Sequence, residues 1–157
     1  MSLLERRKSE VKEMDYKKRS IGAYEEAIQY LTAVENMDAK RCEWQLISPT
    51  ITLGAFACEL FSKSIMYALT QQSEIRGHKL KMDFYDKFPG VTQSNLKNSV
   101  HDKQRFEEYV SDIEELFEMW RYSFEYEKKC SHYSFVIKYA KALKIECERI
   151  LLENQLL

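Results

Sequence analysis

Two charged side chains interrupt the most apolar stretch of the chain, residues 51–69. Glu59 and Lys63 lie four positions apart there, so a helix would place the carboxylate and the ammonium on the same face. A charged group in apolar surroundings costs free energy unless it is paired, so each needs an opposite charge or a cleft open to water. We therefore predict that Glu59 forms an ion pair with Lys63 or with Arg121 inside the fold.

Further polar residues along the chain could together cleave RNA. Cleavage of a phosphodiester needs a cation that stabilises the developing charge and a group that transfers protons near neutral pH. Arg121 could hold the phosphate, and either His78 or His132 could transfer the proton. The structural alternative pairs Arg121 with Glu59 or Glu125, and it has His78 bond to backbone at a helix start. The sequence favours these structural roles over catalysis.

Besides the catalytic candidates Arg121, His132 and His78, the sequence singles out two further groups of residues. The polar cluster consists of Glu59, Lys63, Arg121 and Glu125. Trp120 and Tyr122 flank Arg121, and we expect them to be core or dimer-interface aromatics rather than a platform for stacking bases.

No spacing typical of a metal or nucleotide site occurs in the sequence. A di-metal site in a helical bundle needs a Glu followed three residues later by a His, and this pair is absent. His78, His101 and His132 all fall in predicted connectors, and neither a phosphate-binding loop nor a nucleophile elbow is present. The sequence predicts no metal and no cofactor.

The elements that must position these residues are helices. Only four Gly and two Pro occur, and 31% of the residues are charged, which favours an all-α fold of about five helices in an up-and-down-type bundle. Apolar spacing predicts a central, buried helix from Pro49 to about Gln72, stopped by Gly77. The other predicted helices cover residues 20–38, 80–88, 106–120 and 135–151, and residues 91–101 are predicted to form a loop with at most one helical turn.

A charged segment precedes the bundle. Residues 1–19 hold more Lys and Arg than Asp and Glu and few apolar side chains, which predicts a solvated helical extension, with an arm that docks on a partner as the alternative. Ser20 is the predicted N-cap of the first bundle helix, so the domain boundary is placed between residues 19 and 20. The bundle is expected to occupy residues 20–157.

Composition limits the environment and the partners. The formal net charge of −1 gives no overall attraction to nucleic acid, so RNA is possible but not required as a partner. The four cysteines lack the paired spacing of zinc sites and are expected to be reduced. No secretory run and no stretch long enough to span a bilayer occurs, so we expect a cytoplasmic protein without a membrane partner.

Three motifs in order resemble one family. The first is A-x-x-x-E-L-x-x-K from Ala55 to Lys63, the second is Gly77-His78-Lys79-Leu80, and the third is Trp120-Arg121-Tyr122-x-x-Glu125. Together they resemble the HEPN superfamily, the small helical-bundle domains of prokaryotic defence and toxin–antitoxin systems. The resemblance covers about residues 20–155. It implies a HEPN-like bundle, pairing into homodimers and action through a cognate protein partner.

The sequence departs from the family pattern at the residues that cleave RNA. Active HEPN ribonucleases carry an Arg followed four to six residues later by a His, whereas here the next histidine after Arg121 is His132. Lys79 also replaces the usual Asp of the turn. The resemblance therefore implies a non-catalytic member, and the alternative is an atypical metal-independent ribonuclease that uses Arg121 with His132 or His78.

Overall fold

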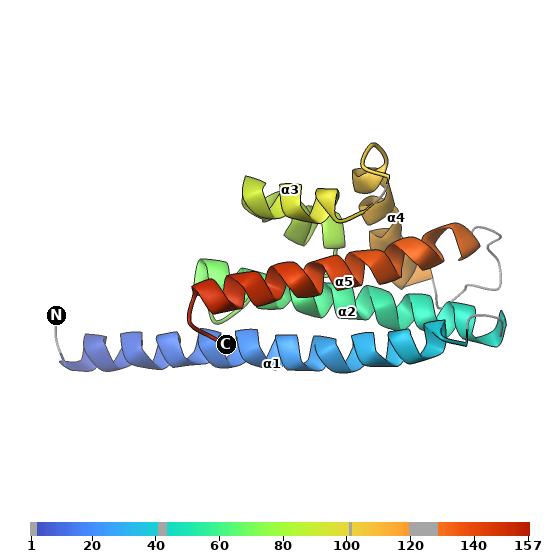
Figure 1. The fold of residues 1–157 in the computed structure, drawn as a ribbon. Coiled ribbons are helices and arrows are strands. Elements are labelled where there is room, and N and C mark those ends of the chain that lie inside the picture. Colours follow the sequence, from blue (N-terminus) through green and yellow to red (C-terminus); the bar gives the residue numbers. More distant parts are fainter. Residues whose placement is uncertain (1–2, 41–43, 101, 120–128) are drawn as a thin grey trace.

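Helices make up every regular element of the chain that the computed structural model describes, namely residues 3–40, 44–100, 102–119 and 129–157 (Figure 1). This confirms the predicted all-α helical bundle. The α-helices are α1 (Leu3–Asp38), α2 (Ile47–Thr70), α3 (Gly90–Asn98), α4 (Phe106–Met119) and α5 (Lys129–Glu153). Shorter helical turns are η1 (Trp44–Leu46), η2 (Leu80–Phe84) and η3 (Tyr85–Lys87).

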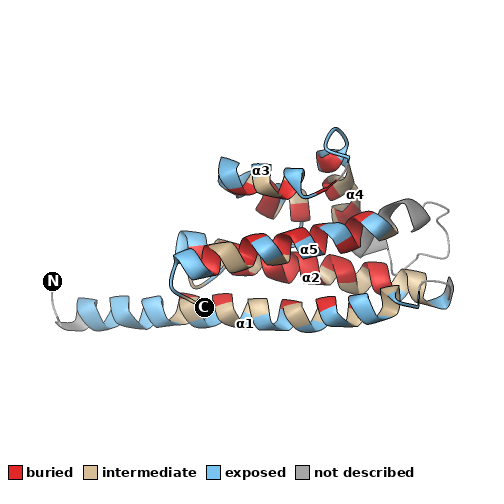
Figure 2. Cartoon of the chain, viewed as in Figure 1, coloured by how far each residue is buried: buried red, intermediate tan, exposed pale blue. Residues whose placement is uncertain are grey.

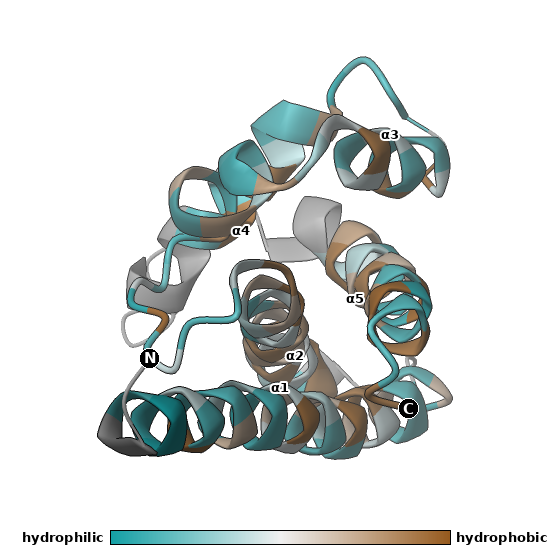
Figure 3. Cartoon of the chain, turned by 90° about the vertical axis from the view of Figure 1, so that its left-hand side faces the viewer, coloured by the Kyte–Doolittle hydropathy of each residue, from teal (hydrophilic) through white to brown (hydrophobic). Residues whose placement is uncertain are grey.

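The central helix is α2, as its sequence predicts. Figure 3 shows α2 between α1, α4 and α5, and α1 and α5 make most of its contacts. α1 runs antiparallel to α2 (Figure 1). α5 runs parallel to α2, because η2, α3 and α4 lead the chain back along one side of the bundle before α5 begins. Since neighbours cover α2 on several sides, its apolar residues occupy most of its circumference rather than one stripe.

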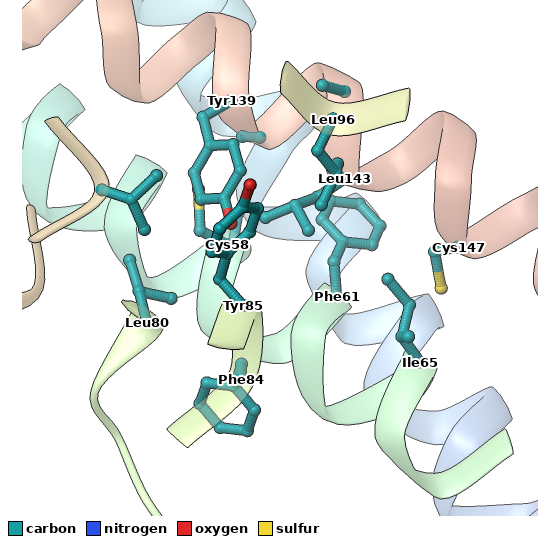
Figure 4. Close-up of a cluster of buried hydrophobic side chains, with 14 of the residues drawn as sticks. Cys58, Phe61, Ile65, Leu80, Phe84, Tyr85, Leu96, Tyr139, Leu143 and Cys147 are labelled. Atoms are coloured by element: carbon teal, nitrogen blue, oxygen red, sulfur yellow. The ribbon is translucent and has the colours of Figure 1, made fainter. Parts of the chain in front are cut away.

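Large apolar side chains from several helices meet around Phe61 of α2. Figure 4 shows this cluster, in which Leu143 of α5 and Leu96 of α3 lie next to Phe61 and are fully buried with it. Burying a side chain of this size contributes about 1.5–3 kcal/mol. The apolar stripe predicted for α4 also faces this core through Phe106 and Ile113.

The two described buried cysteines are free thiols inside the bundle. Burial raises the pKa of the Cys58 thiol on α2, and burial also raises the pKa of Cys147 on α5 to about 12. A thiol that stays protonated is a poor nucleophile, so both act as packed apolar groups, as predicted.

α1 is a single helix that crosses the predicted domain boundary without a break. The prediction that Ser20 caps the first bundle helix is wrong, because Ser20 is buried in the interior of α1. Its Oγ donates to the Ser64 carbonyl at 2.8 Å, and the Ser64 Oγ donates to the Ser20 carbonyl at 2.7 Å. Two small residues that bond across the helix interface let the backbones of α1 and α2 approach closely.

The predicted stop of α2 at Gly77 is also wrong. α2 ends at Thr70, and Gln71 takes the left-handed conformation with φ 54° and donates its N–H to the Tyr67 carbonyl at 3.0 Å. A non-glycine residue in the left-handed conformation costs about 1–2 kcal/mol. For this reason a prediction from sequence places the end of a helix at the nearest glycine, which here is Gly77. Gly77 has φ 110° but lies in the connector that leads to η2.

The segment between α2 and α4 differs from the prediction in two places. Residues 80–87 form η2 and η3 rather than the one α-helix predicted over residues 80–88, although Leu80, Phe84 and Phe88 are buried as their spacing predicts. The predicted loop 91–101 contains α3, which begins directly after Pro89.

Packing against α5 explains why a Ser-, Asn- and Gln-rich segment is helical. Leu96 of α3 is fully buried, and the Asn95 amide donates to Glu146 Oε2 of α5 at 3.1 Å. Burial alone would raise the pKa of the Glu146 carboxyl, but hydrogen bonds from Arg149 and Asn95 lower it below its usual value. Tertiary contacts of this kind override the weak helix propensity of the segment.

Two glycines in helices allow a direct test of this packing. A Cβ at Gly54 of α2 would collide with Val136 Cγ1 of α5, whereas a Cβ at Gly22 of α1 would meet nothing within 4 Å. We expect Gly54→Ala to lower the free energy of unfolding by about 1–2 kcal/mol, because overpacking exceeds the gain in helix propensity. Gly22→Ala should raise it by about 1 kcal/mol. Urea unfolding of both variants measures this, and equal stabilisation by both would contradict the close approach of α2 and α5.

Among the described helices, none combines the length and the apolar content needed to span a bilayer.

Candidate functional site

Glu59 lies at the centre of the polar group that the sequence singles out. It belongs to the middle of α2 and is only 4% exposed, since the apolar residues around it bring this face of α2 against neighbouring helices. Lys63, one turn later, places its Nζ 2.8 Å from Glu59 Oε1, so the ion pair that their spacing predicts is present. The Lys63 side chain is 19% exposed and reaches toward solvent.

His78 contacts the same carboxylate oxygen from a different part of the chain. Its Nδ1 lies 2.8 Å from Glu59 Oε1, while its side chain is 74% exposed. Because a carboxylate accepts hydrogen bonds, Nδ1 carries the proton and donates it. The sequence predicts that His78 bonds to backbone at a helix start, but it bonds to the Glu59 side chain instead. The other ring nitrogen, Nε2, remains free for a second hydrogen bond.

A tight turn holds His78 in place. The Asp83 carboxylate of η2 accepts from the backbone N–H groups of His78 and Lys79, each at 3.0 Å. Gly77 precedes this turn with φ 110°, a conformation that only glycine adopts without strain. The turn therefore fixes the backbone that carries the imidazole.

A second carboxylate secures the start of η2 from α4. Glu114 Oε2 accepts from the Lys81 N–H at 2.8 Å and from the Met82 N–H at 3.0 Å. The first N–H groups of a helical turn lack partners within the turn, and Glu114 supplies one. The carboxylate also places negative charge where the N–H dipoles point.

Sequence reasoning missed both of these carboxylates. A signal existed for Asp83, because Asp within one turn of a helix start often bonds to free backbone N–H groups. None existed for Glu114, since it is far from η2 in sequence and only the packing of α4 brings it there.

A shallow recess surrounds the Glu59 carboxylate. It is lined by Ala55, Glu59, His78, Leu80, Ile113 and Glu114. The recess has no enclosed room for a water molecule, so the side chains around Glu59 fill the space between α2, η2 and α4. Among the residues that line the recess, only His78 is exposed, so a substrate at the recess would meet its ring.

The remaining predicted site residues are placed only in part. Arg121, Glu125 and the predicted interface residues Trp120 and Tyr122 lie outside the described residues. The prediction that His132 falls in a connector is wrong, because His132 belongs to the first turns of α5. The described part of the predicted polar cluster thus consists of Glu59 and Lys63, and the structure adds His78 to it.

The described residues contain no group of three or more His, Cys, Asp or Glu side chains that could hold a metal ion. Within this part of the chain, what the cluster offers chemically is an imidazole oriented by a buried carboxylate, with an ammonium beside it.

Neither a protein-family model, nor a curated protein, nor a solved structure matches this chain.

Proposed function

We propose that this protein is a HEPN-like helical domain of the cytoplasm that works by binding a cognate protein partner, without catalysis, in phage defence or a toxin–antitoxin pair. The observation that carries the proposal is the first part of α1, residues 5–14, which we term the arm. All residues of the arm are exposed, and it projects beyond the other helices (Figures 1 and 2). The arm adds nothing to the core, so its role lies in contacts outside the bundle.

Two features of the Glu59 recess support a non-catalytic role. Glu59 Oε1 is already bonded to Lys63 and His78, and the recess has no enclosed space for a substrate. Lys63 and His78 provide partners for the buried Glu59 carboxylate, and this structural role is enough to explain why the three residues are present.

The arrangement of the first two motifs supports the HEPN resemblance. Glu59 and Lys63 on α2 and His78 in the turn before η2 are separate in sequence but meet at one carboxylate oxygen. We also propose a homodimer, with Trp120 and Tyr122 at the interface, as the resemblance implies.

The second candidate function is an atypical ribonuclease. The observation that favours it is the hydrogen bond from His78 Nδ1 to the buried Glu59, since it orients the ring and leaves Nε2 toward solvent for proton transfer. In this alternative Arg121 holds the phosphate, and His132 is the other candidate for proton transfer.

A cleavage assay separates the two functions. We expect purified protein to leave both structured and unstructured RNA intact, because the recess beside Glu59 and His78 encloses no space that would hold a phosphodiester. The control variants are His78→Ala, His132→Ala and Arg121→Ala, each tested in the same preparation. Cleavage by the wild type that any of these substitutions abolishes would establish the ribonuclease and overturn the non-catalytic proposal.

A further inference from the structure

Two large apolar side chains of α1 are exposed near the N-terminus. Val11 is 67% exposed and Met14 is 74% exposed. Val11 lies about two and a half turns before Ser20, which is fully buried against α2, so the two residues are on opposite sides of the helix. α1 therefore has an inner face that packs on the bundle and, at the arm, an apolar outer face.

Charged residues around this outer face divide into paired and unpaired ones. The paired ones form i,i+4 ion pairs along the helix, namely Arg6 with Glu10 at 3.5 Å, Lys17 with Glu13 at 2.8 Å and Arg19 with Asp15 at 3.1 Å. Four cations make no ion pair with any described residue, namely Arg7, Lys8, Lys12 and Lys18. The acidic side chains of these three pairs already bind a cation of the same helix. The positive charge of the four unpaired cations is therefore not neutralised, and it lies beside Val11 and Met14.

Two of the unpaired cations share a narrow line with the apolar residues. Arg7, Val11, Met14 and Lys18 follow one another at alternating steps of four and three residues, the spacing with which one helix packs along another. We term these four residues the outer seam. All four are exposed.

We infer that the outer seam binds an amphipathic helix with an acidic rim on a partner protein; this rests on the proposed function and names the chemistry of its partner. Apolar residues of the partner helix pack on Val11 and Met14, and its carboxylates meet Arg7 and Lys18. The unpaired cations of the outer seam give this contact its charge complementarity.

The outer seam is a poorer match to other partners. A helix that lies on a membrane needs a wide apolar face, whereas this one is a single line with cations inside it. A nucleic acid would use the cations but leave Val11 and Met14 in water. A second copy of the arm would bring unpaired cations against unpaired cations, which like-charge repulsion disfavours.

The test measures binding of a designed probe to the full chain by fluorescence anisotropy. The probe is a synthetic helical peptide of about three heptads with Leu along one seam and Glu on both flanks. The matched probe carries Lys in place of Glu. We expect the acidic peptide to bind with a Kd below about 100 µM at low salt and more weakly as salt increases, and the basic peptide not to bind.

Substitutions in the chain locate the contact. The double variants Val11→Ser with Met14→Ser and Arg7→Gln with Lys18→Gln should each weaken binding by about tenfold or more. The matched control, Arg6→Gln with Glu10→Gln, removes both members of an ion pair within the helix, keeps the net charge and should change binding less than about twofold. Circular dichroism checks that each variant remains folded.

Absence of binding by the acidic peptide, equal binding by the basic one, or equal loss in the control overturns the inference. Single-stranded RNA and vesicles of anionic lipid are tested with the same variants, and seam-dependent binding of either one instead of the peptide also overturns it. None of these results bears on RNA cleavage, so failure here is distinguishable from failure of the non-catalytic proposal.

Discussion

Replacing Glu59 by Ala is expected to lower the free energy of unfolding by about 3–5 kcal/mol. The substitution leaves the Lys63 ammonium, whose side chain is 19% exposed, without its partner at 2.8 Å in an apolar part of α2. It also removes the acceptor of the His78 ring, so the connector before η2 loses this hydrogen bond to α2. Urea unfolding followed by circular dichroism measures the loss.

An exposed pair of the same geometry provides the control. Lys17 and Glu13 are also four residues apart with a 2.8 Å contact, but both side chains are well exposed. Glu13→Ala should therefore leave the unfolding midpoint unchanged. In the double variant Glu59→Leu with Lys63→Met, most of the lost stability should return, because neither charge remains unpaired. An unchanged midpoint for Glu59→Ala would show that the carboxylate is not buried.

Replacing Gly77 by Ala is expected to lower the free energy of unfolding by about 2–4 kcal/mol. Gly77 has φ 110°, and a Cβ there would lie 2.5 Å from Asp83 Oδ2. The Asp83 carboxylate would have to leave the His78 and Lys79 N–H groups, so strain and lost hydrogen bonds act together. Nuclear magnetic resonance of the His78 ring should show a changed environment, since the same turn aims the ring at Glu59.

Gly90→Ala is the matched control for this change. Gly90 begins α3, and a Cβ there would meet nothing within 4 Å. We expect this variant to be as stable as the wild type or slightly more stable. If Gly77→Ala proved as stable as Gly90→Ala, the turn would not be what positions His78.

The fold class and the central helix could be predicted from the sequence because both depend on local periodicity. Residues 51–69 are apolar around most of a helix, and only a helix covered on several sides suits such a pattern. α4 likewise carries a wide apolar stripe, and Phe106, Val110 and Ile113 of that stripe are buried. Glu59 and Lys63 could be paired in advance since they are one turn apart on one helix.

The ends of helices were not determined locally. Gln71 rather than Gly77 closes α2, and α3 forms where Ser, Asn and Gln predict a loop. The formation of α3 follows from packing, because the burial of Leu96 outweighs the modest differences in propensity between helix and loop.

The candidate site shows the same division. The sequence by itself determined that Glu59 needs a partner, that Lys63 can reach it and that His78 falls in a connector. Only the tertiary structure decided that His78 bonds to Glu59 and that Glu114 of α4 holds the start of η2. Residues far apart in sequence meet through the packing of whole helices, and a spacing rule describes only neighbours on one helix.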